Sequence, residues 1–562
     1  MRETNEGVLA DLVRSRAERQ ADFDVLTFEQ LSSTASGGSA GASHPPPAGA
    51  EVRTYADLAS NANMLAAAFI ARGLEPGDHV AIAMQNHPEF VEAMIAASIT
   101  GVVLVPIDPR TRGEKLSFLL RDARCKGVLC GDYSAQAVDA ARREAPEVRW
   151  LLVLENGGVE ASAFKDATPM AEAFAQAADT VDVRLPGPAH PLEIIYTSGT
   201  TGDPKGVVWP NDRFASFGLL GYLVGYTTDD RPYTGLSLAH GNAQAVTLGP
   251  SLAMGLRAVF SRSFTKSRLW DICRAYGCTT FSLLGGMATA IYSEPPRPDD
   301  ADNPVRLAVS AGMQAAIWRA FEERFGLVVF EWYGAVEGGL AFNPVGVGPI
   351  GSFGKPIPGL EMKILDYDDK ECPPYVMGEI CSRPASGDRA TVEYYGDPEA
   401  SLEKTRAGWL RSGDMGHRDD EGWLYFDYRR GGGLRRNGDF VHAGFVEKVV
   451  AEQAWVSDVC VYGVPAASQA PGESDVVAAV QLEPASESSG SDGSGRSGET
   501  EPGRADALFA ACRRELEPNF VPSYIQFVGE IPKTLSEKTI TRYLIEQFDP
   551  AAPNVYSEGP RT

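Results

Sequence analysis

The residues best suited to chemistry form a short run of small hydroxyl side chains and glycines that ends in a lysine. An apolar segment precedes the run, and the whole stretch reads IIYTSGTTGDPKG over residues 194–206. Small residues let backbone N–H groups and hydroxyls approach an oligophosphate closely, and Lys205 adds a positive charge. The sequence therefore predicts a buried strand followed by a phosphate-binding loop. Its expected ligand residues are Thr197, Ser198, Gly199, Thr200 and Thr201.

This loop differs from the Walker phosphate loop, because no Gly-Lys-Ser/Thr ends it and no helix start follows it. A flexible Ser/Gly linker would have a similar composition. A linker, however, needs neither a buried strand before it nor a lysine at a fixed place. We therefore favour phosphate binding.

Composition limits the partners of this chain. Its 562 residues include 51 basic and 75 acidic side chains, a net charge of −24, whereas nucleic-acid binding needs an extended basic face. Nucleic acid is therefore not expected as a partner. The eight cysteines include no Cys-x-x-Cys pair near histidines, and we interpret them as reduced structural thiols.

The N-terminus and the most apolar stretch favour a cytoplasmic protein without membrane insertion. Residues 1–20 are charged and helix-like, which does not fit a secretory signal. Residues 94–107 are fewer than the roughly 20 apolar residues of a spanning helix, and they include Gly101 and Pro106.

The elements that must position the loop alternate between helix and strand. Thr54 begins a capping-box pattern before an amphipathic helix. Residues 79–84 and 102–107 are expected strands and residues 88–100 a helix, which together make a βαβ unit of a parallel sheet. Further short apolar runs continue this pattern at residues 127–129, 150–154, 194–196 and 307–309.

These patterns predict an α/β protein, with a large N-terminal domain of layered sheets and helices and a small α+β C-terminal domain. The small domain is expected to hold strands near residues 459–464 and 476–482 and a helix near residues 506–516. Residues 32–50 and 484–504 offer little apolar area and are expected to be mobile surface insertions.

Further segments match one enzyme family in a fixed order. They are YTGLSLAHGNAQ (233–244), SAG (310–312), EWYGAVEG (331–338), GWLRSGD (408–414), residues 427–447 and PKTLSEK (532–538). Together with the loop they resemble the signature of adenylate-forming enzymes, the superfamily of acyl-CoA synthetases, nonribosomal peptide adenylation domains and firefly luciferases. The resemblance covers about residues 50–545. Residues 331–338 and the stretch RRGGGLRRNGDFV (429–441) look most similar to fatty-acid-transport-protein and carnitine-type acyl-CoA ligases.

The resemblance implies an acyl-CoA synthetase, an AMP-forming acid–thiol ligase. Its ligands would be ATP or acyl-AMP, Mg²⁺, coenzyme A and a small-molecule carboxylic acid. A carboxylate can attack the α-phosphate of ATP only where cations and oriented donors offset the developing charge, which Lys205, Mg²⁺ and backbone amides would do. By resemblance, Glu337 and Thr200 hold the Mg²⁺, and Lys538 reaches the carboxylate and the α-phosphate.

The nucleotide site is assigned by the same resemblance. Asp414 is expected to accept hydrogen bonds from the ribose hydroxyls, and Arg429 to assist at the ribose or phosphate. The adenine is expected between Gly312, Glu331, Trp332 and Tyr333, with Val336 beside the α-phosphate.

Taken alone, each acidic or basic residue of this set has an ordinary interpretation. Asp414 could be a turn residue, Glu337 a solvated carboxylate and Lys538 a surface charge. Their joint occurrence in family order favours a site. Four arginines, Arg429, Arg430, Arg435 and Arg436, fit either a solvated loop or the phosphates of CoA, although Arg429 is favoured for the nucleotide.

The resemblance also implies a two-step cycle in which a mobile C-terminal domain, residues 430–562, turns against residues 1–429 about a hinge near Gly431. The turn would remove Lys538 and insert the loop that carries Gly438, where a side chain would block the pantetheine arm.

The acyl pocket is assigned by similar positions. It comprises His240, Gly241, Gly285, Gly286 and Met287. The glycines are expected to leave volume for a bulky hydrophobic acid, while turn geometry would also explain them. Polycyclic, terpenoid or steroid-like, and long-chain acids all remain open.

Two departures from the family pattern bear on the first step. Val336 stands where the family usually has a hydroxyl that donates to the α-phosphate, and Glu537 replaces a glycine beside Lys538. Loss of one such donor costs about 10²-fold in rate. We therefore hypothesise impaired adenylation with intact thioesterification, so that a separate adenylating enzyme could supply the acyl-adenylate.

Three alternatives stay open at this point: a carrier-protein acyl-AMP ligase, a luciferase-type oxygenase, and a degenerate homologue that binds nucleotide or acyl-adenylate without turnover. The oligomeric state is also open, with a homodimer among the options.

Overall fold

The computed structural model describes residues 7–30, 47, 49–175, 179–197, 204–429, 434–436, 439–441, 443–466, 474–483, 500–516, 518–533 and 539–558. Most of the two expected insertions, residues 32–50 and 484–504, lies outside this part of the chain. The second insertion ends earlier than predicted, because helix α14 (Glu501–Glu515) already begins at Glu501. A proline in the first turn of this helix is compatible with a helix start, since its missing N–H has no partner there.

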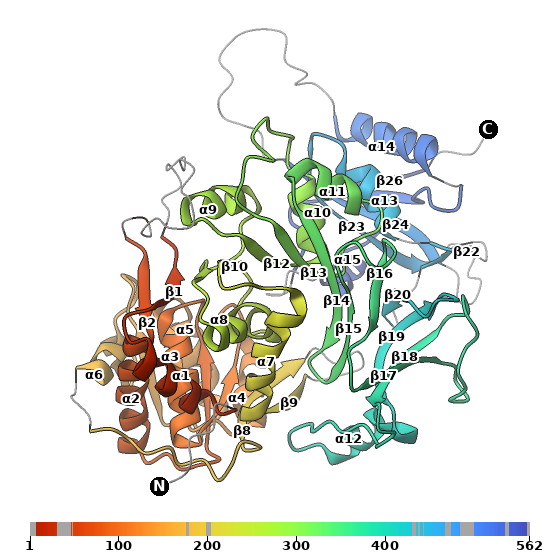
Figure 1. Ribbon diagram of the computed structural model, residues 1–562. Helices are drawn as coiled ribbons and strands as arrows, with labels where there is room; N and C mark the ends of the chain where they lie inside the picture. Colours follow the sequence, from red (N-terminus) through yellow and green to blue (C-terminus); the bar gives the residue numbers. More distant parts are fainter. Residues whose placement is uncertain are drawn as a thin grey trace, which may run out of the picture.

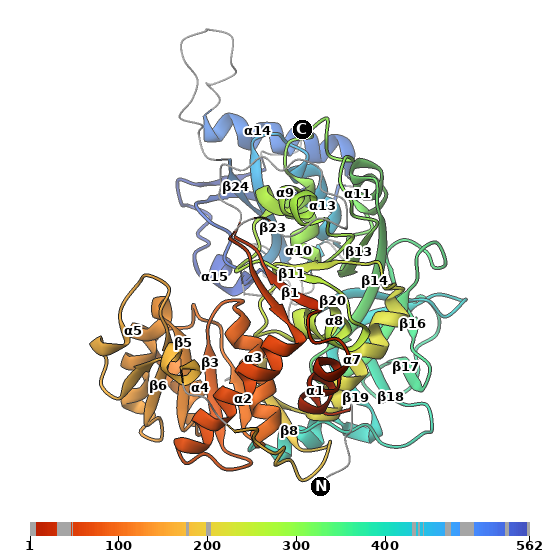
Figure 2. The ribbon, with the colours of Figure 1, turned by 60° about the vertical axis from the view of Figure 1, so that its left-hand side comes forward.

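A large N-terminal domain and a smaller C-terminal domain make up a mixed α/β molecule, as predicted. Figure 1 shows the small domain in blue at the upper right, and Figure 2 shows it again at the far end from the orange seven-stranded sheet. The domain boundary predicted between residues 429 and 430 stays a prediction, because residues 430–433 lie outside the described part.

One sheet of the large domain has seven strands in the order β7-β6-β5-β3-β4-β8-β9. Its strands are β3 (His79–Ala83), β4 (Val103–Pro106), β5 (Gly127–Gly131), β6 (Trp150–Leu154), β7 (Ala167–Pro169), β8 (Pro191–Thr197) and β9 (Lys205–Pro210). Helix α3 (Pro88–Thr100) joins the parallel neighbours β3 and β4, which confirms the predicted βαβ unit. The predicted capping box at Thr54 is also present at the start of α2 (Tyr55–Ala71).

The second sheet has thirteen strands and continues from the core to the C-terminal side of the large domain. Its strands are β1 (Asp24–Phe28), β2 (Glu51–Thr54), β10 (Pro232–Thr234), β11 (Ala258–Phe260), β12 (Thr280–Leu284), β13 (Leu307–Ala311), β14 (Val328–Ala335), β15 (Gly338–Asn343), β16 (Ser352–Pro356), β17 (Leu360–Leu365), β18 (Gly378–Pro384), β19 (Leu410–Arg418) and β20 (Leu424–Arg429). Strands β10 to β14 are parallel, whereas β14 to β20 pair antiparallel.

Helices cover these sheets. They are α1 (Leu9–Arg19), α4 (Gly113–Asp122), α5 (Asp132–Ala141), α6 (Met170–Phe174), α7 (Asn211–Val224), α8 (Gly249–Met254), α9 (Leu269–Tyr276), α10 (Gly285–Tyr292), α11 (Trp318–Phe325) and α12 (Pro398–Lys404), with a π-helix over Ala243–Leu248. Within the described ranges, no helix combines the length and apolar character needed to cross a bilayer.

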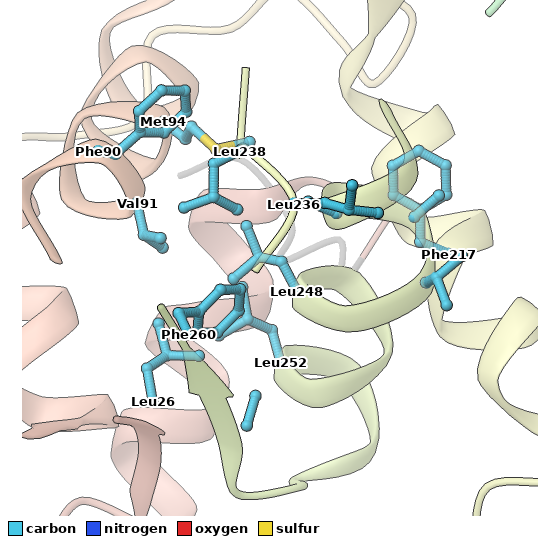
Figure 3. Packing of buried hydrophobic residues seen from close by; sticks show 14 of the residues in the cluster. Leu26, Phe90, Val91, Met94, Phe217, Leu236, Leu238, Leu248, Leu252 and Phe260 are labelled. Atoms are coloured by element: carbon cyan, nitrogen blue, oxygen red, sulfur yellow. The ribbon is translucent and has the colours of Figure 1, made fainter. Parts of the chain in front are cut away.

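The main apolar core lies where helices meet the two sheets. Figure 3 shows part of it, in which Phe90 and Met94 of α3 lie beside Leu238 from the segment between β10 and β11, and Leu248 lies near Leu252. The eight cysteines are buried and free of disulfides, in agreement with the structural role predicted for them.

The small domain is built on the sheet β23 (Val456–Pro465), β24 (Ser474–Leu482), β25 (Tyr524–Val528) and β26 (Val555–Ser557). One face packs on α13 (Ala443–Ala451) and α14, and the other on α15 (Thr541–Glu546). Two short strands, β21 (Arg435–Arg436) and β22 (Asp439–Phe440), pair beside them.

Candidate active site

The predicted phosphate loop lies between two paired strands. Strands β8 and β9 are antiparallel, and Thr197 at the end of β8 lies opposite Lys205 at the start of β9. Strand β9 follows the loop where a Walker loop has a helix, which agrees with the missing helix start in the sequence. Ser198, Gly199, Thr200 and Thr201 lie outside the described residues.

Lys205 and Glu337 lie on either side of one tyrosine. Lys205 Nζ is 3.3 Å from Asp397 Oδ2 and 5.6 Å from the centre of the Tyr394 ring. The Tyr394 hydroxyl donates to Glu337 Oε1 at 3.0 Å, and Lys404 Nζ lies 3.9 Å from the same oxygen. Two cations and two carboxylates therefore gather beside the start of β9.

Asp414 joins this group through the next strands. The Tyr333 hydroxyl donates to Asp414 Oδ2 at 2.7 Å, and Lys404 Nζ donates to the Ser412 carbonyl at 3.3 Å. A cavity of about 10 Å³ is lined by residues that include Tyr333, Glu337, Lys404 and Ser412. Lys205, Glu337 and Asp414 are thus linked by a continuous series of contacts around one place.

Arg429 lies opposite Asp414 in the pairing of β19 with β20. This register brings the two backbones together. The side chain of Arg429 does not belong to the described part of the structure. Lys538, Gly438 and the hinge residue Gly431 also lie outside the described residues.

Val336 is held by its backbone. Its carbonyl accepts hydrogen bonds from Trp209 Nε1 at 3.0 Å and from Arg213 at 2.8 Å. Burial lowers the pKa of Arg213 to about 10, although nearby Glu337 opposes the shift. The hydrocarbon side chain of Val336 is partly buried against the main core. The turn before Glu337 is therefore fixed by two donors from β9 and α7.

Glu331 organises the segment after β13. Its two carboxylate oxygens accept the backbone N–H groups of Gly312 at 2.5 Å and Met313 at 3.0 Å. Burial raises the pKa of Glu331 to about 8, and the two backbone donors act in the opposite direction. Gly312 has φ +99°, a left-handed conformation that glycine adopts readily. Glu331 thus holds the backbone of Gly312, one of the residues expected to contact the adenine.

The other two predicted adenine residues follow on β14. Trp332 is partly buried against the main core. The Tyr333 ring stacks on Phe353 with centroids 4.6 Å apart, which aims its hydroxyl at Asp414.

The glycines of the predicted acyl pocket serve close packing. A Cβ at Gly285 would lie 2.3 Å from the Gly312 carbonyl oxygen, and one at Gly241 would lie 2.5 Å from the Trp209 ring. The expectation that these two glycines leave volume unfilled is wrong, because backbone and indole already occupy the space. His240 precedes Gly241 and is half-buried, while Gly286 and the buried Met287 lie in the first turn of α10.

A buried polar pair lies beneath this region. Gln244 Nε2 donates to the Leu238 carbonyl at 2.9 Å and to Glu193 Oε1 at 3.2 Å. Burial raises the pKa of Glu193 to about 8, and the hydrogen bond from Gln244 lowers it. Glu193 lies on β8, so this pair ties the strand before the phosphate loop to the π-helix after His240.

Sequence reasoning missed four residues of this site. They are Arg213, Tyr394, Asp397 and Lys404. Asp397 carries one local signal, because an Asp before Pro398 is typical of a helix N-cap, and its side chain accepts from the Ala400 N–H. The other three have no motif, since only the fold brings them near Glu337.

The donor set fits a magnesium ion that arrives with a nucleotide. In the described part of the chain, no group of three or more His, Cys, Asp or Glu side chains could hold a metal. Mg²⁺, however, takes one or two protein carboxylates and completes its shell with phosphate oxygens and water. Glu337 could supply such a carboxylate.

Comparison with known proteins decides the family. The model of the AMP-binding enzyme family matches residues 29–390, and that of the AMP-binding enzyme C-terminal domain matches residues 446–538. This chain belongs to the AMP-binding enzyme family. The resemblance to adenylate-forming enzymes is therefore confirmed.

Relatives of this AMP-binding enzyme are CoA ligases. The medium/long-chain-fatty-acid–CoA ligase FadD17 of Mycobacterium tuberculosis is 31% identical over 486 residues, 85% of this chain and 88% of the relative. The crotonobetaine/carnitine–CoA ligase of Proteus mirabilis is 27% identical over 510 residues, 87% and 92% of the two chains. This chain is an acyl-CoA ligase of the adenylate-forming type, and its family uses ATP, CoA and Mg²⁺.

Solved structures share the fold. The anthranilate CoA ligase AuaEII in complex with anthranoyl-AMP matches with a TM-score of 0.78 at 20% identity, over 96% of each chain. The benzoate CoA ligase from Burkholderia xenovorans LB400 matches with a TM-score of 0.74 at 20% identity, over 96% of this chain and 99% of that one.

Proposed function

We propose that this AMP-binding enzyme converts a bulky hydrophobic carboxylic acid into its CoA thioester through an acyl-adenylate. The observation that carries the proposal is the continuous contact series that joins Lys205, Glu337 and Asp414. A nucleotide needs a carboxylate for the ribose, a cation for its phosphates and a carboxylate for the metal, and these three residues supply them together.

Each residue then has a distinct task. Asp414, oriented by Tyr333, accepts the ribose hydroxyls, with Arg429 at the ribose or phosphate. Lys205 and the hydroxyls of its loop contact the phosphates, and Glu337 with Thr200 holds Mg²⁺, which offsets phosphate charge when bound. Lys538 and Gly438 remain the candidates for the adenylating cation and the pantetheine passage.

We further propose that thioesterification is intact while adenylation is slowed. The Val336 backbone is anchored by Trp209 and Arg213, so its hydrocarbon side chain stays at a position where a hydroxyl could donate to the reacting phosphate. A separate adenylating enzyme could then supply the acyl-adenylate in the cytoplasm.

The proposed acid class rests on apolar surroundings and on the relatives. Met287 is buried, and the neighbouring buried strand β12 contributes the apolar side chains Phe281, Leu283 and Leu284 beside two hydroxyls. One relative's name specifies medium- and long-chain fatty acids, which are hydrophobic. Because the glycines beside this region are already in contact with protein, extra pocket volume no longer supports the proposal.

The test measures the two half-reactions separately. Chemically made adenylates of long-chain, polycyclic and terpenoid acids are incubated with CoA, and the same acids are incubated with ATP, Mg²⁺ and CoA. We expect thioester from at least one adenylate and much slower product from the free acid. Adenylate binding without thioester would favour a degenerate homologue, and equal rates from acid and adenylate would remove the adenylation hypothesis. Light scattering on the same preparation tests the homodimer.

A further inference from the structure

A direct polar contact connects the segment after β13, which includes Gly312 of the expected adenine site, to the small domain. Gln314 follows the two residues whose N–H groups bind Glu331, and its Nε2 donates to Glu447 Oε2 at 2.7 Å. Glu447 lies on α13 of the small domain. We infer that Gln314 is a positioning residue. Through its hydrogen bond to Glu447 it couples the conformation of residues 312–314, the nucleotide segment, to the docking of the small domain.

Both ends of this contact are fixed within their own domain. On the large-domain side, Glu331 binds the backbone immediately before Gln314, and Gly285 packs closely against the Gly312 carbonyl. On the small-domain side, Glu447 Oε1 accepts the Val461 N–H of β23 at 2.9 Å. A displacement of either end is therefore transmitted through the hydrogen bond.

The backbone of α13 lies close to the Gln314 side chain at this point. A Cβ at Gly444 of α13 would lie 3.1 Å from Gln314 Oε1, tighter than an ordinary contact. Burial raises the pKa of Glu447, while the hydrogen bonds from Val461 and Gln314 act in the opposite direction. A buried acceptor that loses its donor keeps its desolvation cost, which makes the docked geometry sensitive to Gln314.

A second contact in the same interface lies away from the nucleotide segment and provides a matched control. Lys266 Nζ donates to the Ser457 carbonyl of the small domain at 2.7 Å and lies 3.6 Å from Glu483. Its other partner, Glu294 at 2.7 Å, belongs to the large domain. Lys266 therefore stabilises docking without touching the residues around Gly312.

The inference rests on the proposed function, because it needs AMP to bind beside Gly312 and Asp414. Coupling between two sites is reciprocal and commonly changes an equilibrium by about 5–150-fold. If the Gln314 hydrogen bond carries the coupling, AMP should shift the docked fraction of the small domain, and the shift should depend on the Gln314 donor.

The experiment follows the distance between the domains in the full chain. Dye pairs are placed on Lys165→Cys and Arg514→Cys, whose native side chains are 88% and 68% exposed, and the buried native cysteines leave these sites selective. Single-molecule energy transfer is recorded with and without AMP for the wild type, Gln314→Met and Lys266→Met. Calorimetry measures AMP affinity in each.

We expect AMP to shift the docked fraction of the wild type, Gln314→Met to reduce this shift about tenfold, and Lys266→Met to change docking while keeping the AMP response. A wild-type AMP response in Gln314→Met, or equal loss of response in both variants, would overturn the inference. AMP binding without any wild-type shift would overturn it as well, with the proposed function intact. Failure of the wild type to bind AMP would overturn both.

Discussion

Two pairs of carboxylates in the large domain are used in opposite ways. Glu193 and Glu331 are buried, and their oxygens face donors of the protein itself, a glutamine amide and two backbone N–H groups. Glu337 and Asp414 each accept a tyrosine hydroxyl. A phenol can rotate away, so a ribose hydroxyl or a metal can take its place. The backbone donors of Glu331 belong to the chain itself, and the amide that donates to Glu193 also donates to the Leu238 carbonyl, so neither is easily exchanged for a ligand.

This difference in hydrogen-bond donors suggests a different role for each pair of acidic residues. The first pair positions the strand before the phosphate loop and the segment after β13, and the second pair is the one that we propose meets ligands. Substitutions in the second pair should change rates and affinities with little effect on folding. Substitutions in the first should change stability.

The largest expected effect is at Glu337. Glu337→Gln keeps an acceptor for Tyr394 but removes the charge for Mg²⁺, so adenylation should fall by about 10²–10³-fold, the cost of losing one strong charge-stabilising group. Pyrophosphate exchange measures it. The control Glu403→Gln alters an exposed carboxylate on α12 and should leave the rate unchanged. An unaltered exchange rate in Glu337→Gln would place the metal elsewhere.

Val336→Thr, in the turn before Glu337, is expected to increase the rate of adenylation. A hydroxyl at this position should raise the adenylation rate by up to about 10²-fold, because it restores one donor to the reacting phosphate. Val347→Thr, at an exposed valine, serves as the control and should do nothing. No increase in pyrophosphate exchange for Val336→Thr would show that the missing hydroxyl does not limit the first step.

Asp414→Asn tests the second pair through the affinity for AMP. The amide can still accept from Tyr333, but a neutral group binds ribose hydroxyls less strongly, so AMP affinity should fall by roughly 10-fold. Isothermal calorimetry measures this affinity, with Asp420→Asn in the adjoining turn as an exposed control. Equal affinities of the two variants would argue against a ribose contact.

Glu193→Gln should have the smallest effect on the reaction, because it acts on stability. Burial raises the pKa of Glu193 to about 8 from an ordinary value of 4.5, so the folded protein keeps a proton that the unfolded chain releases. Stability from this group is complete below pH 4.5 and is lost as pH rises toward 8. The variant cannot titrate there, so between pH 5 and pH 8 its stability should fall less than that of the wild type, by roughly 3 kcal/mol.

Thermal unfolding of the wild type, Glu193→Gln and the exposed control Glu18→Gln at pH 5 and pH 8 measures the difference. A pH slope of Glu193→Gln equal to that of the control would mean that Glu193 is ionised in the fold.

The sequence predicted the elements that repeat a simple physical pattern. The capping box at Thr54, the βαβ unit around α3 and the buried strand before the phosphate loop follow from local spacing and apolar runs. Tyr394 and Lys404 could not be predicted, because their role depends on how α12 and its neighbours fold back toward β14. The filling of space at Gly241 and Gly285 was equally hidden, since the atoms that fill it come from distant residues.

The central claim is that Lys205, Glu337 and Asp414 surround one nucleotide site, and a crystal structure of the protein soaked with AMP tests it most directly. The account predicts ribose hydroxyls at Asp414, adenine beside Gly312 and the phosphate directed toward Lys205 and Glu337. AMP bound at another place, with these three side chains unchanged and untouched, would contradict it.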